Sequence, residues 1–298
     1  MSERRHLTPR DGLDLIVHDF GGDGQIGLFA HATGFPLRTY APLLERLGNR
    51  LHLIGPDLRG HGGSSWPSPS AGQPASAADW QGFADDLSAT LASLAPEPRP
   101  PQVIGIGHSS GASALVLAEV ASPGTFAALY CYEPAFFAAS DSAAEALVAG
   151  RASAALRRTA RFASRAAARE RLSGGPLAGL DPASLEGYLD AGFVREEDGS
   201  LSLALRPDWE AAIYEGAPQA GARLAKAKVA CPVRVACGGR TDALARRAAE
   251  ALAAQLATAE LEVIDGLTHL GPLERPAEVA ASLLGFLEAI HVPDTPSA

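Results

Sequence analysis

The chain has 298 residues, of which 47% are hydrophobic, and its formal net charge is −9 at pH 7. This hydrophobic content is enough to bury a large core, and the acidic balance excludes roles that need a basic face for nucleic-acid phosphates. No apolar run reaches the length of about 18 residues that a membrane-spanning helix needs, and residues 1–12 are charged and lead into no signal-peptide core. We therefore expect a cytoplasmic protein with no nucleic-acid partner and no stable membrane association.

Strand-length apolar runs alternate with helix-length amphipathic segments in both flanks of the chain. The runs predict strands over residues 13–20, 25–32, 51–57, 101–107, 126–134, 231–239 and 259–265. The first two strands are joined by a Gly-Gly-Asp-Gly turn of hairpin character. The amphipathic segments predict helices over residues 38–48, 79–95, 109–122, 243–257 and 276–290. This alternation is typical of an α/β fold with a mostly parallel sheet and helices on both faces.

The composition changes after residue 134. Residues 135–228 are rich in Ala, Arg, Leu and Glu, and they predict several short helices with one candidate strand at 201–205. A segment of this length is too long to be an unstructured loop inside a compact domain. We expect a core domain made of residues 1–134 and 229–298, with residues 135–228 forming a helical cap or lid insert over the functional site.

Ser109 is the first candidate for chemistry. In GIGHSSG, residues 105–111, it stands between Gly107 and Gly111 at the junction of a predicted strand and a predicted helix. A tight turn here would hold the serine side chain above the sheet edge, and the two glycines would let neighbouring backbone pass. The alternative is an ordinary serine that caps the following helix. The strand-to-helix context favours a nucleophile.

A nucleophilic serine needs a base, and His269 is the best candidate among the eight histidines. It lies in GLTHLGPLERP, between the last predicted strand and the last predicted helix, at the edge where parallel strands end. Two carboxylates compete for the role of the acid that orients this histidine. Asp242 follows the strand at 231–239, and Glu133 ends the strand at 126–134. The chain order Ser, Asp, His favours Asp242, and Glu133 is the alternative acid.

The loop after the second predicted strand supplies candidate donors for an oxyanion hole. In HATGF, residues 31–35, the backbone N–H of Thr33 or Gly34 could join that of Ser110 to bind developing negative charge. His31, and likewise His61 and Arg59 in DLRGHGGS, are interpreted as residues that order these loops. The three cysteines show no metal-site or disulfide spacing, so we expect no metal and no cofactor.

Five segments in chain order, HATGF, DLRGHGGS, GHSSG, CGGRTD and GLTHLGPLERP, together resemble the α/β-hydrolase superfamily. The resemblance covers both flanks of the chain and leaves the insert unmatched. It implies an α/β-hydrolase fold with a mostly parallel, eight-stranded type of sheet, and Ser109, Asp242 and His269 as nucleophile, acid and base. Ala32 departs from the commoner His-Gly start of the oxyanion loop. A serine at 109, where dehalogenases and epoxide hydrolases of the superfamily have aspartate, disfavours those two chemistries.

The expected function is therefore a serine hydrolase of the carboxylesterase type. It would cleave a carboxylic ester, thioester or lactone of a small to medium substrate through an acyl-enzyme on Ser109. The same triad could serve a carbon–carbon bond hydrolase, an amide hydrolase or an acyltransferase. A hypothesis of another class is a small-molecule-binding protein on a hydrolase scaffold. The expected partner is a small-molecule substrate, and a homodimer is left open.

The insert concentrates arginines in an otherwise acidic chain. The spacing of Arg158, Arg161, Arg165 and Arg169 would place them on one face of a continuous helix. A solvated face is the favoured interpretation. The alternative is a basic stripe that attracts an anionic substrate or a partner surface, because guanidinium groups suit carboxylate and phosphate recognition.

Overall fold

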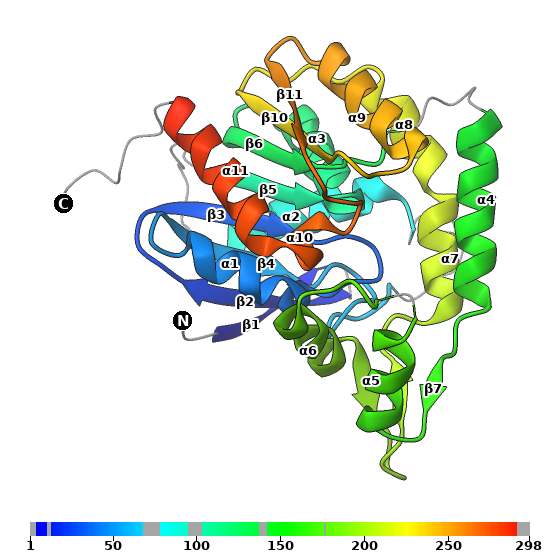
Figure 1. The fold of residues 1–298 in the computed structure, drawn as a ribbon. Coiled ribbons are helices and arrows are strands. Elements are labelled where there is room, and N and C mark those ends of the chain that lie inside the picture. The colour runs from blue at the N-terminus through cyan, green and yellow to red at the C-terminus, as the bar shows by residue number, and fades with distance from the viewer. Residues whose placement is uncertain are drawn as a thin grey trace.

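A computed structural model describes residues 4–10, 13–67, 78–94, 103–136, 142–175 and 177–290. Its centre is an eight-stranded sheet with the strand order β1-β2-β4-β3-β5-β6-β10-β11 (Figure 1). The strands are β1 (Arg4–Arg10), β2 (Leu13–Gly21), β3 (Gln25–Ala30), β4 (Leu51–Pro56), β5 (Val103–His108), β6 (Phe126–Tyr132), β10 (Val233–Gly238) and β11 (Ala259–Ile264). Strand β2 runs antiparallel to β1 and β4, and the other pairs are parallel. The predicted α/β-hydrolase fold with a mostly parallel eight-stranded sheet is confirmed.

The start of the sheet differs from the expectation in two ways. Strand β1 was not predicted, because its sequence RRHLTPR is largely polar and shows no apolar alternation. The expected hairpin between β2 and β3 is wrong, since β4 lies between them. The glycine turn passes across the start of β4 instead: a Cβ atom on Gly22 would come within 2.1 Å of the Leu51 carbonyl oxygen, and one on Gly24 within 2.4 Å of that of Arg50.

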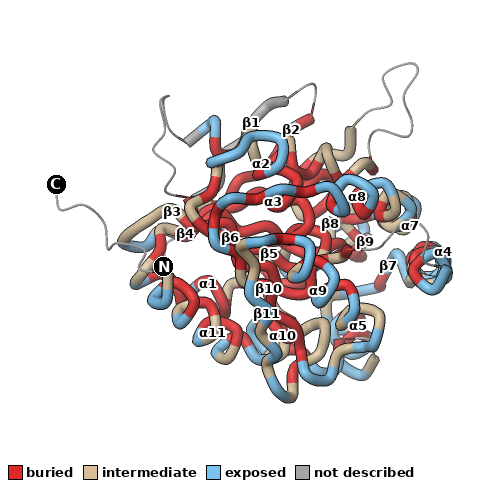
Figure 2. The backbone as a smooth tube through the Cα atoms, turned by 90° about the horizontal axis from the view of Figure 1, so that it is seen from above, coloured by how far each residue is buried: buried red, intermediate tan, exposed pale blue. Residues whose placement is uncertain are grey.

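Two layers of helices cover the two faces of the sheet. One face carries α2 (Trp80–Leu94), α3 (Ser110–Ala121), α8 (Ala217–Leu224) and α9 (Ala243–Gln255), and the other carries α1 (Ala41–Leu47), α10 (Gly271–Glu274) and α11 (Pro276–Ala289). Successive strand residues alternate between the two cores, as Leu28 packs into the first and Phe29 into the second. Figure 2 shows buried positions along the strands and exposed positions on the outer sides of the helices.

The segment between β6 and β10 contains both helices and a small sheet. Its elements before α8 are α4 (Ser142–Leu156), β7 (Arg161–Phe162), α5 (Arg165–Ser173), α6 (Pro182–Ala191), β8 (Phe193–Arg195), β9 (Leu201–Leu203) and α7 (Pro207–Glu215). The three short strands form an antiparallel sheet in the order β7-β9-β8, where the sequence predicted only one strand. Helix α8 packs against α2 and α3 of the core. From here on, the insert means residues 142–175 and 177–215, the described part of the predicted insert at 135–228 that precedes α8.

Aromatic contacts attach the insert to the core. The indole rings of Trp66 and Trp209 stack with centroids 5.1 Å apart, and the indole N–H of Trp80 donates to the Ile213 carbonyl at 2.9 Å. Helices α4 and α7 lie side by side (Figure 1). Within the described ranges, no helix is both long enough and apolar enough to cross a membrane.

Candidate active site

Ser109 occupies a sharp turn between β5 and α3. Its backbone torsions are φ 53° and ψ −120°, a combination that a residue with a side chain rarely adopts. The Ser109 N–H donates to the Tyr132 carbonyl at 2.9 Å, so the neighbouring strand β6 helps to hold the turn. The Ser109 side chain makes no capping hydrogen bond to α3, contrary to the alternative of an ordinary cap serine.

The flanking glycines are required by the space around this turn. A Cβ atom on Gly107 would lie 2.5 Å from the Cα of Ala112. One on Gly111 would lie 2.3 Å from the carbonyl oxygen of Ala30. Both contacts are with backbone, which cannot rotate away. The two glycines therefore allow α3 to start directly against β3 and β5.

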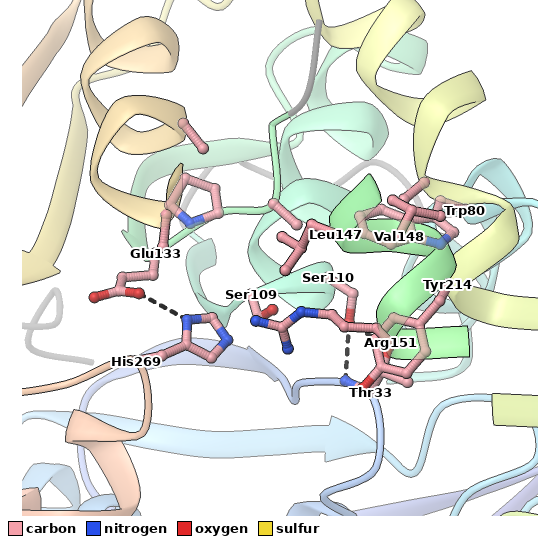
Figure 3. A pocket seen from close by; sticks show the side chains of 15 residues that line it. Thr33, Trp80, Ser109, Ser110, Glu133, Leu147, Val148, Arg151, Tyr214 and His269 are labelled. Carbon is pink, nitrogen blue, oxygen red and sulfur yellow. Dashed lines mark hydrogen bonds and ion pairs between the residues drawn. The ribbon is translucent and has the colours of Figure 1, made fainter. Parts of the chain in front are cut away.

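His269 is hydrogen-bonded to Glu133, which was the alternative acid. The His269 Nδ1 lies 2.7 Å from Glu133 Oε2, and Figure 3 shows the imidazole between Glu133 and Ser109. The Glu133 carboxylate is buried, and it also accepts hydrogen bonds from the Gly238 N–H at 2.9 Å and the Thr241 hydroxyl at 2.8 Å. Since a buried carboxylate needs such partners to offset its lost hydration, three donors hold Glu133 in place.

Asp242 lies at the start of α9 and makes no hydrogen bond to His269. Its Oδ1 accepts from the backbone N–H groups of Leu244 and Ala245 at 3.0 and 2.9 Å, so it is the N-cap of that helix. The side chain is exposed. Our first choice for the acid is thus occupied as a helix cap, a role in which aspartate is strongly preferred. The carboxylate beside the histidine comes from the end of the adjacent strand β6.

His108, which precedes the candidate nucleophile, connects two loops of the site. Its Nε2 lies 2.8 Å from the His269 carbonyl oxygen, and its Nδ1 lies 2.8 Å from the Tyr40 hydroxyl. A carbonyl can only accept, so Nε2 carries the proton and Nδ1 accepts from Tyr40. The Tyr40 oxygen in turn accepts from the Ala32 N–H at 3.1 Å. A buried chain of hydrogen bonds therefore joins the loop of His269 to residues 31–34, and the sequence reasoning did not find it.

Of the three candidate oxyanion donors, Thr33 and Ser110 lie together at the start of α3, and Gly34 faces His61. The Thr33 N–H donates to the Ser110 Oγ at 2.9 Å, and the Thr33 hydroxyl lies 2.9 Å from the same oxygen. The Gly34 N–H donates to His61 Nε2 at 2.9 Å. Ser110 is the first residue of α3, where a backbone N–H has no acceptor within the helix. The Gly34 N–H is thus used in a hydrogen bond to His61, and the Thr33 N–H in one to the Ser110 side chain.

The buried histidines of the neighbouring loops are neutral. His31 Nε2 accepts from the Leu58 N–H at 2.8 Å, which leaves Nδ1 to donate to the Ala32 carbonyl. Burial lowers the pKa of His31, and it lowers the pKa of His61 to about 3. Arg59 pairs with the buried Asp86 at 2.7 Å. These contacts agree with the interpretation that the three residues order the loops.

Ser109, Glu133 and His269 line one pocket, shown in Figure 3. Its wall also contains Thr33 and Ser110 from the core and apolar side chains such as Trp80 and Val148. Its volume is about 40 Å³. Within the described residues, no cluster of His, Cys, Asp or Glu side chains could hold a metal ion.

The four arginines at 158, 161, 165 and 169, for which a solvated helix face was favoured and a basic stripe was the alternative, do not lie on one helix. Arg158 and Arg161 precede α5, which begins at Arg165 behind the capping residue Ser164, so the four arginines do not share one helix. Each is paired with a carboxylate: Arg158 with Glu210, Arg161 with Asp198, Arg165 with Glu186 and Asp190, and Arg169 with Glu186. The expectation of a common helix face is wrong because the helix starts later than the spacing suggested.

The chain belongs to the alpha/beta hydrolase family, whose model matches residues 15–282. A search of curated proteins gives no sequence match. Among solved structures, E-2-(acetamidomethylene)succinate hydrolase is similar with a TM-score of 0.78 and 20% identity, over 96% of this chain and all of the other. The peroxisomal alpha-beta-hydrolase Lpx1 of Saccharomyces cerevisiae has a TM-score of 0.76 and 17% identity, over 100% of this chain and 90% of its own. The thioesterase domain from the curacin biosynthetic pathway has a TM-score of 0.73 and 17% identity, over 95% of this chain and 100% of its own.

Proposed function

We propose that this chain is a serine hydrolase that cleaves a carboxylic ester, thioester or lactone through an acyl-enzyme on Ser109. The observation that carries the proposal is the hydrogen bond from His269 Nδ1 to the buried Glu133, 2.7 Å long, in the pocket that Ser109 also lines. A histidine fixed in this way presents its other nitrogen to a nucleophile. The strained backbone of Ser109 agrees, because such strain concentrates at functional residues.

In this proposal Glu133 takes the role for which Asp242 was first preferred. Glu133 accepts the Nδ1 proton, which leaves Nε2 unprotonated and able to act as a base. Its charge would stabilise the imidazolium that forms during the reaction. The Gly238 N–H and the Thr241 hydroxyl keep the carboxylate oriented. Asp242 has no part in the chemistry and only caps α9.

The reaction has two half-steps. Ser109 Oγ attacks the carbonyl carbon while its proton passes to His269 Nε2, and the carbonyl oxygen becomes an oxyanion. The bond to the leaving alcohol or thiol then breaks, and that group takes the proton from His269. A water molecule next gives a proton to His269 and attacks the acyl carbon. Ser109 leaves with this proton as the acid product is released.

The oxyanion would be held by backbone N–H groups of Ser110 and Thr33. The Ser110 N–H is favoured by its place at the N-terminus of α3, where the helix dipole also attracts negative charge. The Thr33 N–H is bonded to Ser110 Oγ, so the Ser110 side chain must rotate before Thr33 can donate to the oxyanion. Gly34 is removed from the donor set, since its N–H serves His61.

The names of two similar structures, a hydrolase of a succinate derivative and a thioesterase, support cleavage by water as the reaction. The test is active-site labelling with a fluorophosphonate beside turnover of para-nitrophenyl acetate and butyrate. We expect peptide mass spectrometry to find the label on Ser109, and Ser109→Ala to lose both label and turnover by several orders of magnitude. Folded wild-type protein that neither labels nor turns over an ester would overturn the proposal in favour of a binding protein.

A further inference from the structure

A single arginine of the insert reaches the candidate active site. Arg151, on α4, lines the pocket that contains Ser109, Glu133 and His269, and Figure 3 shows its guanidinium group directed into that pocket. The opposite walls are the core loops and the first turn of α3. Arg151 is therefore the only cationic side chain with a permanent charge among the described residues that line this pocket.

Arg151 has no carboxylate partner, in contrast to the four paired arginines. Within the described parts of the chain, no ion pair joins Arg151 to an aspartate or glutamate. Its neighbour in the pocket is Tyr214: burial and the Glu210 charge raise the pKa of the Tyr214 hydroxyl to about 12, and the Arg151 and Arg158 charges and a hydrogen bond from Arg151 oppose this rise. Glu210 is already bound to Arg158. The half-buried guanidinium of Arg151 therefore has donors available for an anion that enters the pocket.

Arg151 and Tyr214 also line a second, larger pocket within the insert. Its volume is about 430 Å³, against about 40 Å³ at Ser109. Its wall combines apolar side chains, such as Phe162 and Leu172, with the arginines at 157, 158 and 171 and with Glu210, which is paired with Arg158. The space beside Ser109 suits a small acyl group, whereas the space beyond Arg151 suits a larger and negatively charged remainder.

We propose that the substrate carries a carboxylate and that Arg151 binds it. This inference rests on the proposed function of Ser109 and names its substrate class: acyl compounds with a short acyl chain and a carboxylate on the leaving group. The planar guanidinium can donate two parallel hydrogen bonds to one carboxylate, which fixes both its distance and its orientation. Arg151 is in this view a specificity residue, and the chemistry at Ser109 proceeds without it.

The test compares esters that differ in charge. Phenyl acetate and para-acetoxybenzoate differ by a carboxylate on the leaving group, and para-nitrophenyl hexanoate and mono-para-nitrophenyl adipate differ by a carboxylate on the acyl chain. Each variant is compared with the wild type on the same ester, so the intrinsic reactivity of the ester cancels. We expect Arg151→Gln to lower kcat/KM for para-acetoxybenzoate by about 10- to 100-fold, the range for a lost charged hydrogen bond, with a raised KM. Phenyl acetate should change by less than about twofold.

Two further variants separate charge from fold. Arg151→Lys keeps the charge but loses the paired donors, and we expect it to recover part of the affinity for para-acetoxybenzoate. Arg161→Gln removes one arginine of the insert that is exposed and lines neither pocket, and it should leave both esters unchanged. Turnover of phenyl acetate by each variant also shows that the protein is folded.

The outcomes distinguish this inference from the function on which it rests. A wild type that takes the fluorophosphonate label and cleaves phenyl acetate, with Arg151→Gln equally active on all four esters, overturns the role of Arg151 alone. A loss confined to the adipate ester overturns the placement of the carboxylate on the leaving group. No turnover of any ester and no label overturn both proposals together.

Discussion

The core loops around Ser109 and the insert above them are stabilised in different ways. In the core, backbone torsions and buried hydrogen bonds fix each group: Glu133 has three donors, and His108 bridges two loops. In the insert, apolar side chains such as Phe162 and Tyr188 pack into one core cluster, ion pairs lie at half-exposed positions, and α4 packs on α7 mainly through small residues such as Ala152, Ala155 and Ala211. The hydrogen bonds of the core therefore fix the positions of the groups around Ser109. Side chains of the insert can vary with less effect on those positions.

The largest expected effect contrasts the two candidate acids. Glu133→Gln keeps the shape of the side chain but loses the charge that orients His269, so we expect kcat to fall by about three to four orders of magnitude. Asp242→Asn keeps a good helix cap and should retain nearly full activity. Ester kinetics on both variants, with circular dichroism as a check of folding, decide between them. Equal losses in the two variants would contradict the assignment of Glu133.

A pair of glycine substitutions contrasts the packing of the two regions. Gly111→Ala places a Cβ atom 2.3 Å from the Ala30 carbonyl oxygen, and we expect the free energy of unfolding to fall by about 3 kcal/mol or more, or folding to fail. Gly150→Ala, in the middle of α4, has open space, so we expect a gain of about 0.5 to 1 kcal/mol from helix propensity. Urea unfolding measures both. A tolerated alanine at 111 would mean that the contact between α3 and β3 is looser than described.

Acid should destabilise the core through its buried histidines. Burial holds the pKa of His31, His61 and His108 below the ordinary histidine value of about 6.5, and for His61 at about 3. Below pH 6.5 the unfolded chain binds protons that these folded side chains do not, so stability is complete above that pH and falls as the pH decreases. Each of these histidines can lower the free energy of unfolding by at most about 1.4 kcal/mol for each pH unit below its pKa in the unfolded chain.

The melting temperature between pH 7 and pH 4 measures this loss. Asp57 acts in the same direction: burial raises its pKa, but the hydrogen bond and charge of His18, with His31 and the Leu37 N–H, together lower it further than burial raises it. His61→Gln should reduce the dependence of the melting temperature on pH by the contribution of one histidine. An unchanged melting temperature down to pH 4 would show that the histidines titrate freely in the folded protein.

The smallest expected effect concerns the ion pairs on the surface of the insert. Arg161 and Asp198 are both largely exposed, and such pairs contribute about 0 to 1 kcal/mol. We expect Asp198→Asn to change the free energy of unfolding by less than about 0.5 kcal/mol, and the change to shrink further in 1 M salt. A larger loss by urea unfolding would mean that these pairs, rather than packing, hold the insert together.

The sequence predicted the core better than the insert, for physical reasons. Strands and helices of the core carry apolar periods that burial enforces, and the glycines beside Ser109 mark a turn that only glycine allows. The choice between Glu133 and Asp242 was harder, because β6 and β10 are neighbours and both acids follow strand ends. A signal did exist: Asp242 immediately precedes a helical segment, the usual place of a cap. Strand β1 and the order of β2, β4 and β3 depend on long-range pairing that local pattern does not encode.

The insert offered weaker signals. The prediction of one helix face for its arginines overlooked the start of α5 at Ser164. Serine commonly caps helices, so this residue was a signal that a helix begins there. Arg151 was not distinguished from the other arginines, because its place at the pocket depends on how α4 lies over Ser109. Which carboxylate a surface arginine contacts depends on how the helices pack in three dimensions and not on the spacing of the arginines along the chain.

The buried bridge through His108 and Tyr40 has a consequence for protein engineering. It couples the backbone at His269 to the backbone at Ala32, so a shift of either segment would be transmitted to the other. Mutant libraries aimed at new substrates should therefore leave positions 31–34, 40, 108 and 268–271 untouched and diversify the inner sides of α4 and α7. If the proposed function holds, such libraries would keep one set of reacting groups and exchange only the surface that the substrate meets.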